Sequence, residues 1–215
     1  EDGYYPESFV NMLALLGWNP GTEQEIFSME ELIQSFSLDR VHKSGSRFDP
    51  EKAKWFNHWY LQQRSDTQIA MEFREVLRTK GFHIDMGELE ELVRMVKERV
   101  SFVREIWDET DFFFKAPESF DPEAVKKRWK PDSPAVLKEL QEVLEKTEDF
   151  SPSGTEASVR KWIEEKGYNM GAVMNAFRLV MVGSLRGPHM FEIISWIGRE
   201  ETSRRIQKGI SSIGK

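Results

Sequence analysis

Apolar residues recur every three or four positions along most of the chain, and this spacing predicts helices. Shorter stripes of this kind cover residues 69–77, 136–144 and 173–181, and none of them alternates with the period of two that is typical of strands. The longest stripe predicts one continuous amphipathic helix between Gly87 and Asp108; it consists of Leu89, Leu92, Val93, Val96, Val100, Val103 and Trp107. We therefore expect an all-α protein of nine or ten short helices with little or no sheet.

Local signals mark where these helices begin and end. Ser28 and Glu31 have the spacing of a capping box, and Gly81, Gly167 and Gly198 mark helix ends. A cap residue stands before a first-turn proline at Asp49-Pro50, Asp121-Pro122 and Ser133-Pro134. Segments 116–134 and 148–155 are rich in Pro, Ser and Gly, and a further break is expected near residue 65. These breaks predict a small module at 1–65, a helical bundle at 66–147 and a second bundle at 148–215.

The composition is that of a globular protein with enough apolar material for a core: 39% of its 215 residues are hydrophobic and 31% are charged. The absence of cysteine excludes disulfides and thiolate chemistry. No apolar run approaches the ~18 residues needed to cross a bilayer, so we expect no membrane partner and a cytoplasmic location. Because residue 1 is Glu and not Met, we also expect a fragment of a longer protein.

Charge is unevenly distributed along the chain. The net charge of −7 argues by itself against a nucleic-acid binder, and DNA is not an expected partner. Residues 151–215, however, hold ten basic and six acidic residues, a net charge of +4, which leaves −11 for residues 1–150. The C-terminal part is therefore either a basic face that meets a polyanion or simply a solvated basic end.

The sequence contains no recognisable catalytic or metal-binding motif. Its four histidines form no His-x-x-His, His-Glu-x-x-His or His-x-Gly-His pattern, and there is neither a Gly-x-x-x-x-Gly-Lys-Ser/Thr loop nor a Gly-x-Ser-x-Gly elbow. The many carboxylates are expected to lie on solvated faces of amphipathic helices. We therefore predict no catalytic residue, no metal site and no cofactor in this chain.

Two aromatic and basic segments remain as candidates for function. At helical spacing, Trp55, Phe56, Trp59 and Tyr60 are expected to be mostly core residues. The pattern at residues 177–194 predicts a helix, a turn that contains Gly and Pro, and a second helix. The turn leaves backbone groups free, and the basic and apolar side chains that flank it are Arg178, Arg186, His189, Met190 and Phe191. Single-stranded RNA favours this combination, although a turn that serves geometry alone remains the alternative.

Several long motifs resemble those of the bacterial-type glutamyl-tRNA synthetases, from just past their second ATP-binding signature to their C-terminal end. They occur in the family's order and cover nearly the whole chain: PESFVNMLALLGWNP (6–20), FSMEELI (27–33), KSGSRFDPEK (43–52), GSLRGPHMFEII (183–194) and IGREET (197–202). The resemblance implies a C-terminal fragment in which residues 1–65 form the stem-contact module and the remainder forms the α-helical anticodon-binding cage. It implies tRNA(Glu) as the RNA partner, with a monomer favoured.

The same resemblance assigns chemistry to a part that this chain lacks. ATP, with Mg, would activate glutamate in an upstream nucleotide-binding domain, so this chain should be inactive by itself.

The resemblance also implies a set of RNA-binding residues. Arg178 corresponds to an arginine on the anticodon bases, and Gly187, Pro188 and Met190 correspond to the loop and the apolar residue that hold the first two bases. Arg99 corresponds to the reader of the third base, with Arg94 and Arg104 as alternatives. The candidates for the tRNA backbone are Lys43, Arg47, Lys52, Lys54 and Arg186. A function of a different class, an all-α protein-interaction scaffold with a basic C-terminal docking face, is the alternative that composition leaves open.

Overall fold

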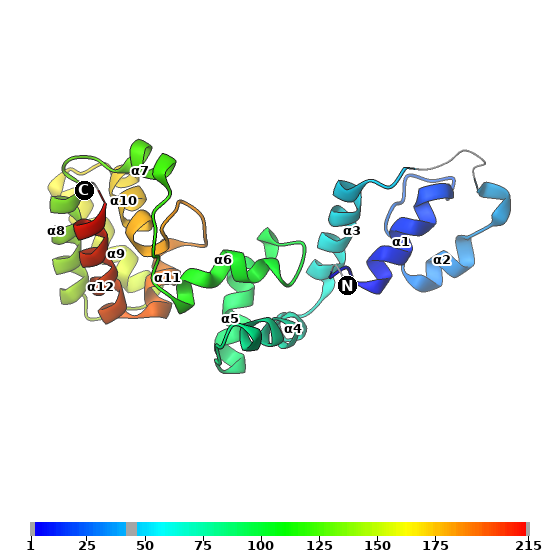
Figure 1. Cartoon of the computed structure of the whole chain (residues 1–215), viewed down its shortest axis with the longest axis horizontal. Coiled ribbons are helices and arrows are strands. Elements are labelled where there is room, and N and C mark those ends of the chain that lie inside the picture. The colour runs from blue at the N-terminus through cyan, green and yellow to red at the C-terminus, as the bar shows by residue number, and fades with distance from the viewer. Residues whose placement is uncertain (1–2, 42–46, 214–215) are drawn as a thin grey trace. The chain divides into compact units, whose positions relative to one another are not determined.

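The computed structural model describes residues 3–41 and 47–213 (Figure 1). Over these residues the chain forms twelve α-helices and two 3-10 helices, and its strand-like pairing is limited to an isolated antiparallel bridge between Trp18 and Val41. The prediction of an all-α protein is confirmed. None of the described helices is both long and apolar enough to span a bilayer.

The chain divides into two compact units, Glu1–Asp108 and Glu109–Lys215. The first unit contains α1 (Pro6–Gly17), α2 (Met29–Ser35), η1 (Leu38–Arg40), α3 (Pro50–Gln63), α4 (Asp66–Thr79), α5 (Met86–Val96) and η2 (Lys97–Arg99). α6 (Glu105–Phe114) begins in the first unit and ends in the second, which also contains α7 (Pro122–Arg128), α8 (Ser133–Lys146), α9 (Pro152–Lys166), α10 (Met170–Val182), α11 (Met190–Ile197) and α12 (Arg199–Ser212). The three functional modules expected from the sequence, with borders at 65 and 147, stay a prediction.

Most helix starts follow the local signals. The Ser28 hydroxyl accepts a hydrogen bond from the Glu31 N–H at 3.1 Å while the Glu31 carboxylate accepts one from the Ser28 N–H at 2.7 Å, so the predicted capping box is confirmed. Asp49 and Asp121 cap α3 and α7 as expected. At α8 the prediction is wrong by one residue, because the Ser133 hydroxyl accepts a hydrogen bond from the Lys130 N–H and closes a turn before the helix.

In the first unit, α1 packs on α3 and α4 packs on α5. Met12 of α1 meets Ala53 and Phe56 of α3 in one buried cluster. A second cluster lies where α1 meets α2 and consists of Trp18, Phe27 and Leu32.

The aromatic residues of α3 are only partly core residues. Phe56 is fully buried, whereas Trp55 and Trp59 expose 45% and 37% of their surface. The expectation that this aromatic group is mostly buried is therefore wrong for the two tryptophans. The reason is their spacing of four residues, which places both on the same side of α3, away from the side that packs on α1.

The apolar stripe between residues 87 and 108 does not form one helix. α5 ends at Val96, η2 follows, and the chain turns before α6 begins. The Glu105 carboxylate accepts hydrogen bonds from the N–H groups of Ser101 (2.7 Å) and Phe102 (3.2 Å), and these bonds start a new helix. Burial would raise the pKa of Glu105, but these hydrogen bonds and the Lys54 ammonium group outweigh it and hold the pKa below its usual value. The predicted long helix is thus replaced by two helices and a turn.

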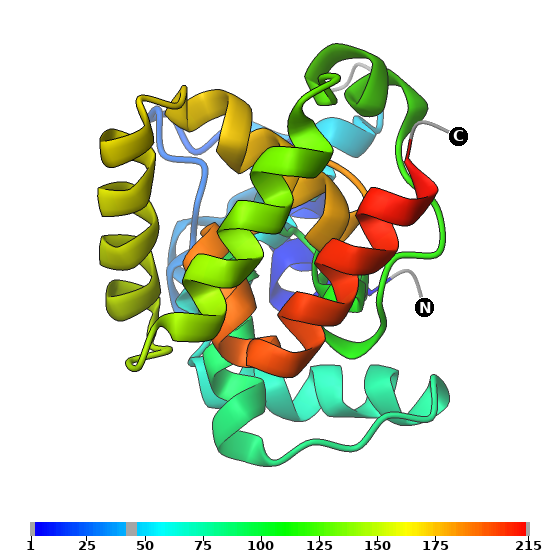
Figure 2. The same ribbon diagram turned by 90° about the vertical axis from the view of Figure 1, so that its left-hand side faces the viewer.

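In the second unit, α10 packs on α12, and both pack on α8. Figure 2 looks onto this unit, in which α8 (yellow-green) and α12 (red) run side by side. Leu140, Phe177 and Ile206 are among its fully buried residues. Arg205 is also buried, and its Nη1 donates to the carbonyl oxygens of Phe112 (2.7 Å) and Met181 (2.9 Å). This arginine therefore joins α12 to α6 and α10.

Candidate nucleic-acid interface

The predicted helix–turn–helix at 177–194 is present: α10 ends at Val182, and α11 begins at Met190. Gly183 caps α10 with a φ of +81°, and its carbonyl oxygen accepts a hydrogen bond from the Asp121 N–H at 2.7 Å. A side chain at position 183 would stand 2.7 Å from the Ser119 carbonyl oxygen, so only glycine fits. The connecting turn, residues 183–189, is therefore fixed at its first residue to the segment that precedes α7.

Arg178 holds the turn from α10. Its Nη1 donates to the carbonyl oxygen of Arg186 and its Nη2 to that of Pro188, both at 2.9 Å. The planar guanidinium group suits this task because its two nitrogens reach two acceptors in a fixed geometry. The expected contact between Arg178 and anticodon bases stays a prediction; in the unbound protein, this side chain determines the shape of the turn.

Gly187 lies where the turn passes closest to α6. Its φ of +102° is unfavourable for any residue with a side chain, and an added Cβ would lie 3.0 Å from the Phe112 ring. The Arg186 guanidinium group binds the Asp111 carboxylate at 2.7 Å and lies 5.7 Å from the centre of the same ring. Arg186 is thus oriented by α6, with part of its side chain still exposed.

The turn exposes an apolar residue, Leu185, that the sequence did not single out, and the expected contact of Met190 with the anticodon bases stays a prediction. Met190 is only 2% exposed and Phe191 is 3% exposed, so both belong to the core, whereas Leu185 exposes 37%. Among the described residues of Glu109–Lys215, Leu185 is the one large apolar side chain that is exposed. Sequence reasoning missed Leu185, although its place between Gly183 and Gly187 on a turn was a usable signal.

A polar hollow of about 400 Å³ adjoins the turn within the second unit. Its lining includes both charges and hydroxyls: Asp111, Lys115, Ser119, Asp121, Ser184 and Arg186. His189 precedes α11 with an exposed side chain that makes no capping bond. The turn therefore presents Leu185, His189 and Arg186 beside a polar hollow, which is the mixture of groups that binds unstacked bases.

The candidates for the third base lie in the first unit. Arg99 ends η2 and is exposed; its side chain makes no hydrogen bond or ion pair with the described residues. Arg94 binds the Asp66 carboxylate at 3.4 Å, and Arg104 stacks on the Phe102 ring at 4.7 Å. Arg99 is therefore the candidate whose guanidinium group is least engaged.

The candidates for the tRNA backbone are also in the first unit, apart from Arg186. Lys52 forms an ion pair with Glu25, and Lys54 forms one with Glu105 at 3.1 Å. Arg47 is exposed beside a hollow of about 290 Å³ that Lys52 also lines. Lys43 lies outside the described residues. Exposed ion pairs of this kind contribute little stability.

A helical fold with an arginine-held turn and exposed basic, aromatic and apolar side chains is compatible with an RNA-binding domain, and comparison with known families agrees. The family model described as "Anticodon binding domain" matches residues 60–210. The chain therefore belongs to the anticodon-binding domain family. Residues 1–55 match a second model, described as "tRNA synthetases class I (E and Q), catalytic domain".

Similar proteins are named glutamate–tRNA ligase. Those of Flavobacterium johnsoniae and Bacteroides fragilis are 51% and 52% identical over 213 and 211 residues, which is 99% and 98% of this chain and 42% of each relative. A crystal structure of a glutamate tRNA ligase from Elizabethkingia meningosepticum in complex with its amino acid has a TM-score of 0.92 at 43% identity, over 99% of this chain and 42% of that one. The resemblance to glutamyl-tRNA synthetases is confirmed, and the chain spans less than half the length of these relatives.

Proposed function

We propose that the chain is the tRNA-binding C-terminal part of a glutamate–tRNA ligase and that it recognises the anticodon arm of glutamate tRNA. The observation that carries the proposal is the turn 183–189, which Arg178 holds open with two hydrogen bonds inside the segment matched as an anticodon-binding domain. Because the turn is already ordered in the unbound protein, its backbone groups can bind base edges without a further loss of conformational entropy.

We infer different roles for the exposed and the buried residues around the turn. Leu185 and His189 are exposed and offer faces on which unstacked bases pack, while Arg186 offers a charge for phosphate or a donor for a base. Arg178, Gly187 and Pro188 set the path of the backbone, and Met190 anchors α11 in the core. In this proposal, Arg178 contacts bases only if RNA draws its guanidinium group away from the turn.

The third anticodon base is assigned to Arg99. Its planar fork donates two hydrogen bonds to a base edge, and it has no carboxylate partner among the described residues that RNA would have to displace. Arg99→Gln should relax discrimination at the third base, with Arg94→Gln as the matched control. An equal loss of third-base discrimination in the two variants would contradict the assignment to Arg99.

Attachment of glutamate is assigned to the upstream part of the class I catalytic domain, which would use ATP with Mg. The residues of this chain do not fit that task, because neither ATP signature loop is in the sequence and the described residues hold no group of three or more metal-ligating side chains. We therefore expect this chain alone to leave tRNA uncharged.

The test is binding of the chain to glutamate tRNA and to the same tRNA with altered anticodon bases, at two salt concentrations. A preference for the native anticodon at both salts is expected, because phosphate contacts weaken with salt whereas base contacts are largely preserved. Equal, salt-sensitive binding to every RNA, or no binding, would contradict the proposal and favour a protein-interaction scaffold.

A further inference from the structure

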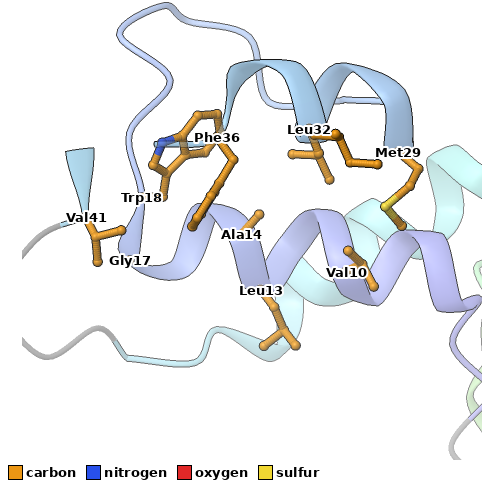
Figure 3. Close-up of a pocket in the computed structure, with 10 residues that line it drawn as sticks. Val10, Leu13, Ala14, Gly17, Trp18, Met29, Leu32, Phe36 and Val41 are labelled. Atoms are coloured by element: carbon orange, nitrogen blue, oxygen red, sulfur yellow. The ribbon is translucent and has the colours of Figure 1, made fainter. Parts of the chain in front are cut away.

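The two units expose different chemistry. In the first unit, an apolar groove lies between α1 and α2 (Figure 3), within the segment that matches the class I catalytic domain. In the second unit, the last turn of α7 and the loop that follows it expose a cluster of cations, which we call the α7 patch: Lys126, Lys127, Arg128 and Lys130. The function proposed above assigns no role to this patch.

The charge of the α7 patch is not neutralised within the protein. Its four side chains are exposed and form no ion pair or hydrogen bond with the described residues. Among the described cations of Glu109–Lys215, the others that lack a partner are Lys138 and Lys146 of α8. The unpaired positive charge of this unit is therefore concentrated within residues 126–130.

A stabilising effect on α7 explains only part of this concentration of charge. A cation in the last turn of a helix interacts favourably with the helix dipole. Exposed cations this close together also repel one another. The Asp121 carboxylate does not relieve the repulsion, because it caps the N–H groups of Glu123 and Ala124 at the opposite end of α7. The patch is therefore suited to an anion that carries several negative charges.

α7 is fixed beside the turn 183–189. The Asp121 N–H, at the start of α7, donates to the Gly183 carbonyl oxygen at 2.7 Å, and α7 packs on α10 (Figure 1). A rise of about 1.5 Å per residue places Lys127 roughly 9 Å from Asp121 along the helix axis. About three stacked nucleotides span this distance, at roughly 3.4 Å each. A strand whose bases lie at the turn can therefore bring its phosphates to the patch.

We propose that the α7 patch binds phosphate groups of the RNA strand whose bases lie at the turn 183–189. This proposal rests on the function proposed above, because that function supplies the strand. Arg128 offers a planar fork for two phosphate oxygens, and the three lysines act as point charges. Phosphate contacts carry no sequence information, so the patch contributes affinity and holds the strand in place while the turn discriminates between bases.

The first test compares two variants with equal losses of charge. The patch variant combines Lys126→Gln, Lys127→Gln, Arg128→Gln and Lys130→Gln. The control variant combines Lys138→Gln, Lys146→Gln, Arg160→Gln and Lys161→Gln, which removes four exposed cations from α8 and α9 of the same unit. Binding of glutamate tRNA, and of the same tRNA with altered anticodon bases, is titrated from about 50 to 200 mM salt.

We expect the patch variant to bind both RNAs at least about tenfold more weakly at the lower salt concentration. The slope of its log binding constant against log salt should be smaller by about two to three. The ratio of affinities for native and altered anticodons should stay that of the parent, since phosphate contacts do not read sequence. The control variant should keep the slope of the parent. Equal changes of slope in the two variants would overturn the proposal.

The same titrations separate this proposal from the function on which it rests. A slope that depends on the patch, without any anticodon preference, would support phosphate binding and contradict anticodon recognition. An anticodon preference with an unchanged slope in the patch variant would support anticodon recognition and overturn the patch. Absence of RNA binding by the parent would overturn both.

A second measurement on the parent protein guards against a misfolded variant. Its exposed lysines are acetylated with an N-hydroxysuccinimide ester, with and without glutamate tRNA, and the rate at each site is read by peptide mass spectrometry. With tRNA at ten times its Kd, the rates at Lys126, Lys127 and Lys130 should fall by about five- to tenfold, as the unbound fraction does. Lys138 and Lys146 should react as before. Unprotected patch lysines would overturn the proposal and favour an acidic protein as the occupant.

Discussion

The side-chain amide of Asn57 donates a hydrogen bond of 2.6 Å to the carbonyl oxygen of Ser101, in the turn between η2 and α6. Asn57 is fully buried in α3, and its oxygen accepts a second bond, from the Tyr5 N–H at 2.8 Å. Two neighbours on α3 act on the same turn: His58 Nδ1 bonds to the Val100 carbonyl oxygen at 2.8 Å, and Gln62 bonds to that of Lys97. α3 therefore fixes the backbone at 97–101, which includes the third-base candidate Arg99.

Asn57→Ala should lower the free energy of unfolding by about 2–3 kcal/mol, because two buried peptide groups lose their partner. The measurement is the midpoint of urea denaturation. Asn19→Ala is the control, since Asn19 accepts one hydrogen bond in an exposed turn and should cost less than about 1 kcal/mol. Equal costs for the two variants would show that the buried bonds carry no special weight.

Arg178→Ala should weaken binding of glutamate tRNA by about 1–3 kcal/mol and reduce the preference for the native anticodon. Arg178→Lys should restore little of this affinity or preference, because one ammonium group cannot reach the carbonyl oxygens of Arg186 and Pro188 in the same geometry. Binding is measured with native and anticodon-altered tRNA. Arg160→Ala, which removes an exposed arginine of α9, should keep the preference intact. An unchanged preference in Arg178→Ala would remove this residue from the site.

Gly187→Ala should destabilise the protein by more than about 2 kcal/mol, since it adds a contact with the Phe112 ring to an unfavourable backbone conformation. Gly81→Ala separates the two effects. Gly81 has a φ of +83° with no atom within 4 Å of an added Cβ, so its cost should be about 1–2 kcal/mol. Thermal or urea denaturation measures both, and a larger cost for Gly81→Ala would contradict a close contact between residue 187 and the Phe112 ring.

Leu185→Ala should leave the free energy of unfolding within about 0.5 kcal/mol of the parent, because the side chain is exposed. It should nevertheless weaken tRNA binding by about 1 kcal/mol, through the loss of an apolar face for a base. Met190→Ala, by contrast, should lower the free energy of unfolding by about 2–5 kcal/mol, because the Met190 side chain is buried. Denaturant unfolding and tRNA titration are measured on both variants. Unchanged tRNA binding by Leu185→Ala would contradict the proposed contact between Leu185 and a base.

Glu201 should make stability depend on pH. Burial raises its pKa, but hydrogen bonds from Arg204 and Arg205 outweigh burial and lower the pKa below the ordinary value of 4.5. A carboxyl group with a lowered pKa stabilises the fold above its unfolded value, and this contribution disappears as pH falls through the folded value. Urea midpoints at pH 7 and pH 4 should therefore differ less in Glu201→Gln than in the parent.

Glu200→Gln, at an exposed neighbouring position, is the control for that measurement and should keep the parent's pH response. A Glu201→Gln variant with the parent's full loss of stability between the two pH values would contradict the assignment.

The helical class and most helix ends could be predicted from the amino-acid sequence. Apolar spacing and caps such as Ser28 with Glu31 are local, so they act in the same way whatever the rest of the chain does. It also located the turn at 183–189, because Gly and Pro interrupt two apolar stripes there. The motifs at both ends of the chain were long enough to indicate the family.

Which members of these patterns are buried depends on contacts between residues that are distant in sequence. The stripe at 87–108 has helical spacing throughout, but Asn57 and its neighbours supply partners to the backbone at 97–101 and the chain turns there. Trp59 and Leu185 are exposed and Met190 is buried for the same reason, since burial depends on residues distant in sequence. Arg178 holds backbone carbonyls, and because every residue has a carbonyl, no sequence pattern could have identified its partners.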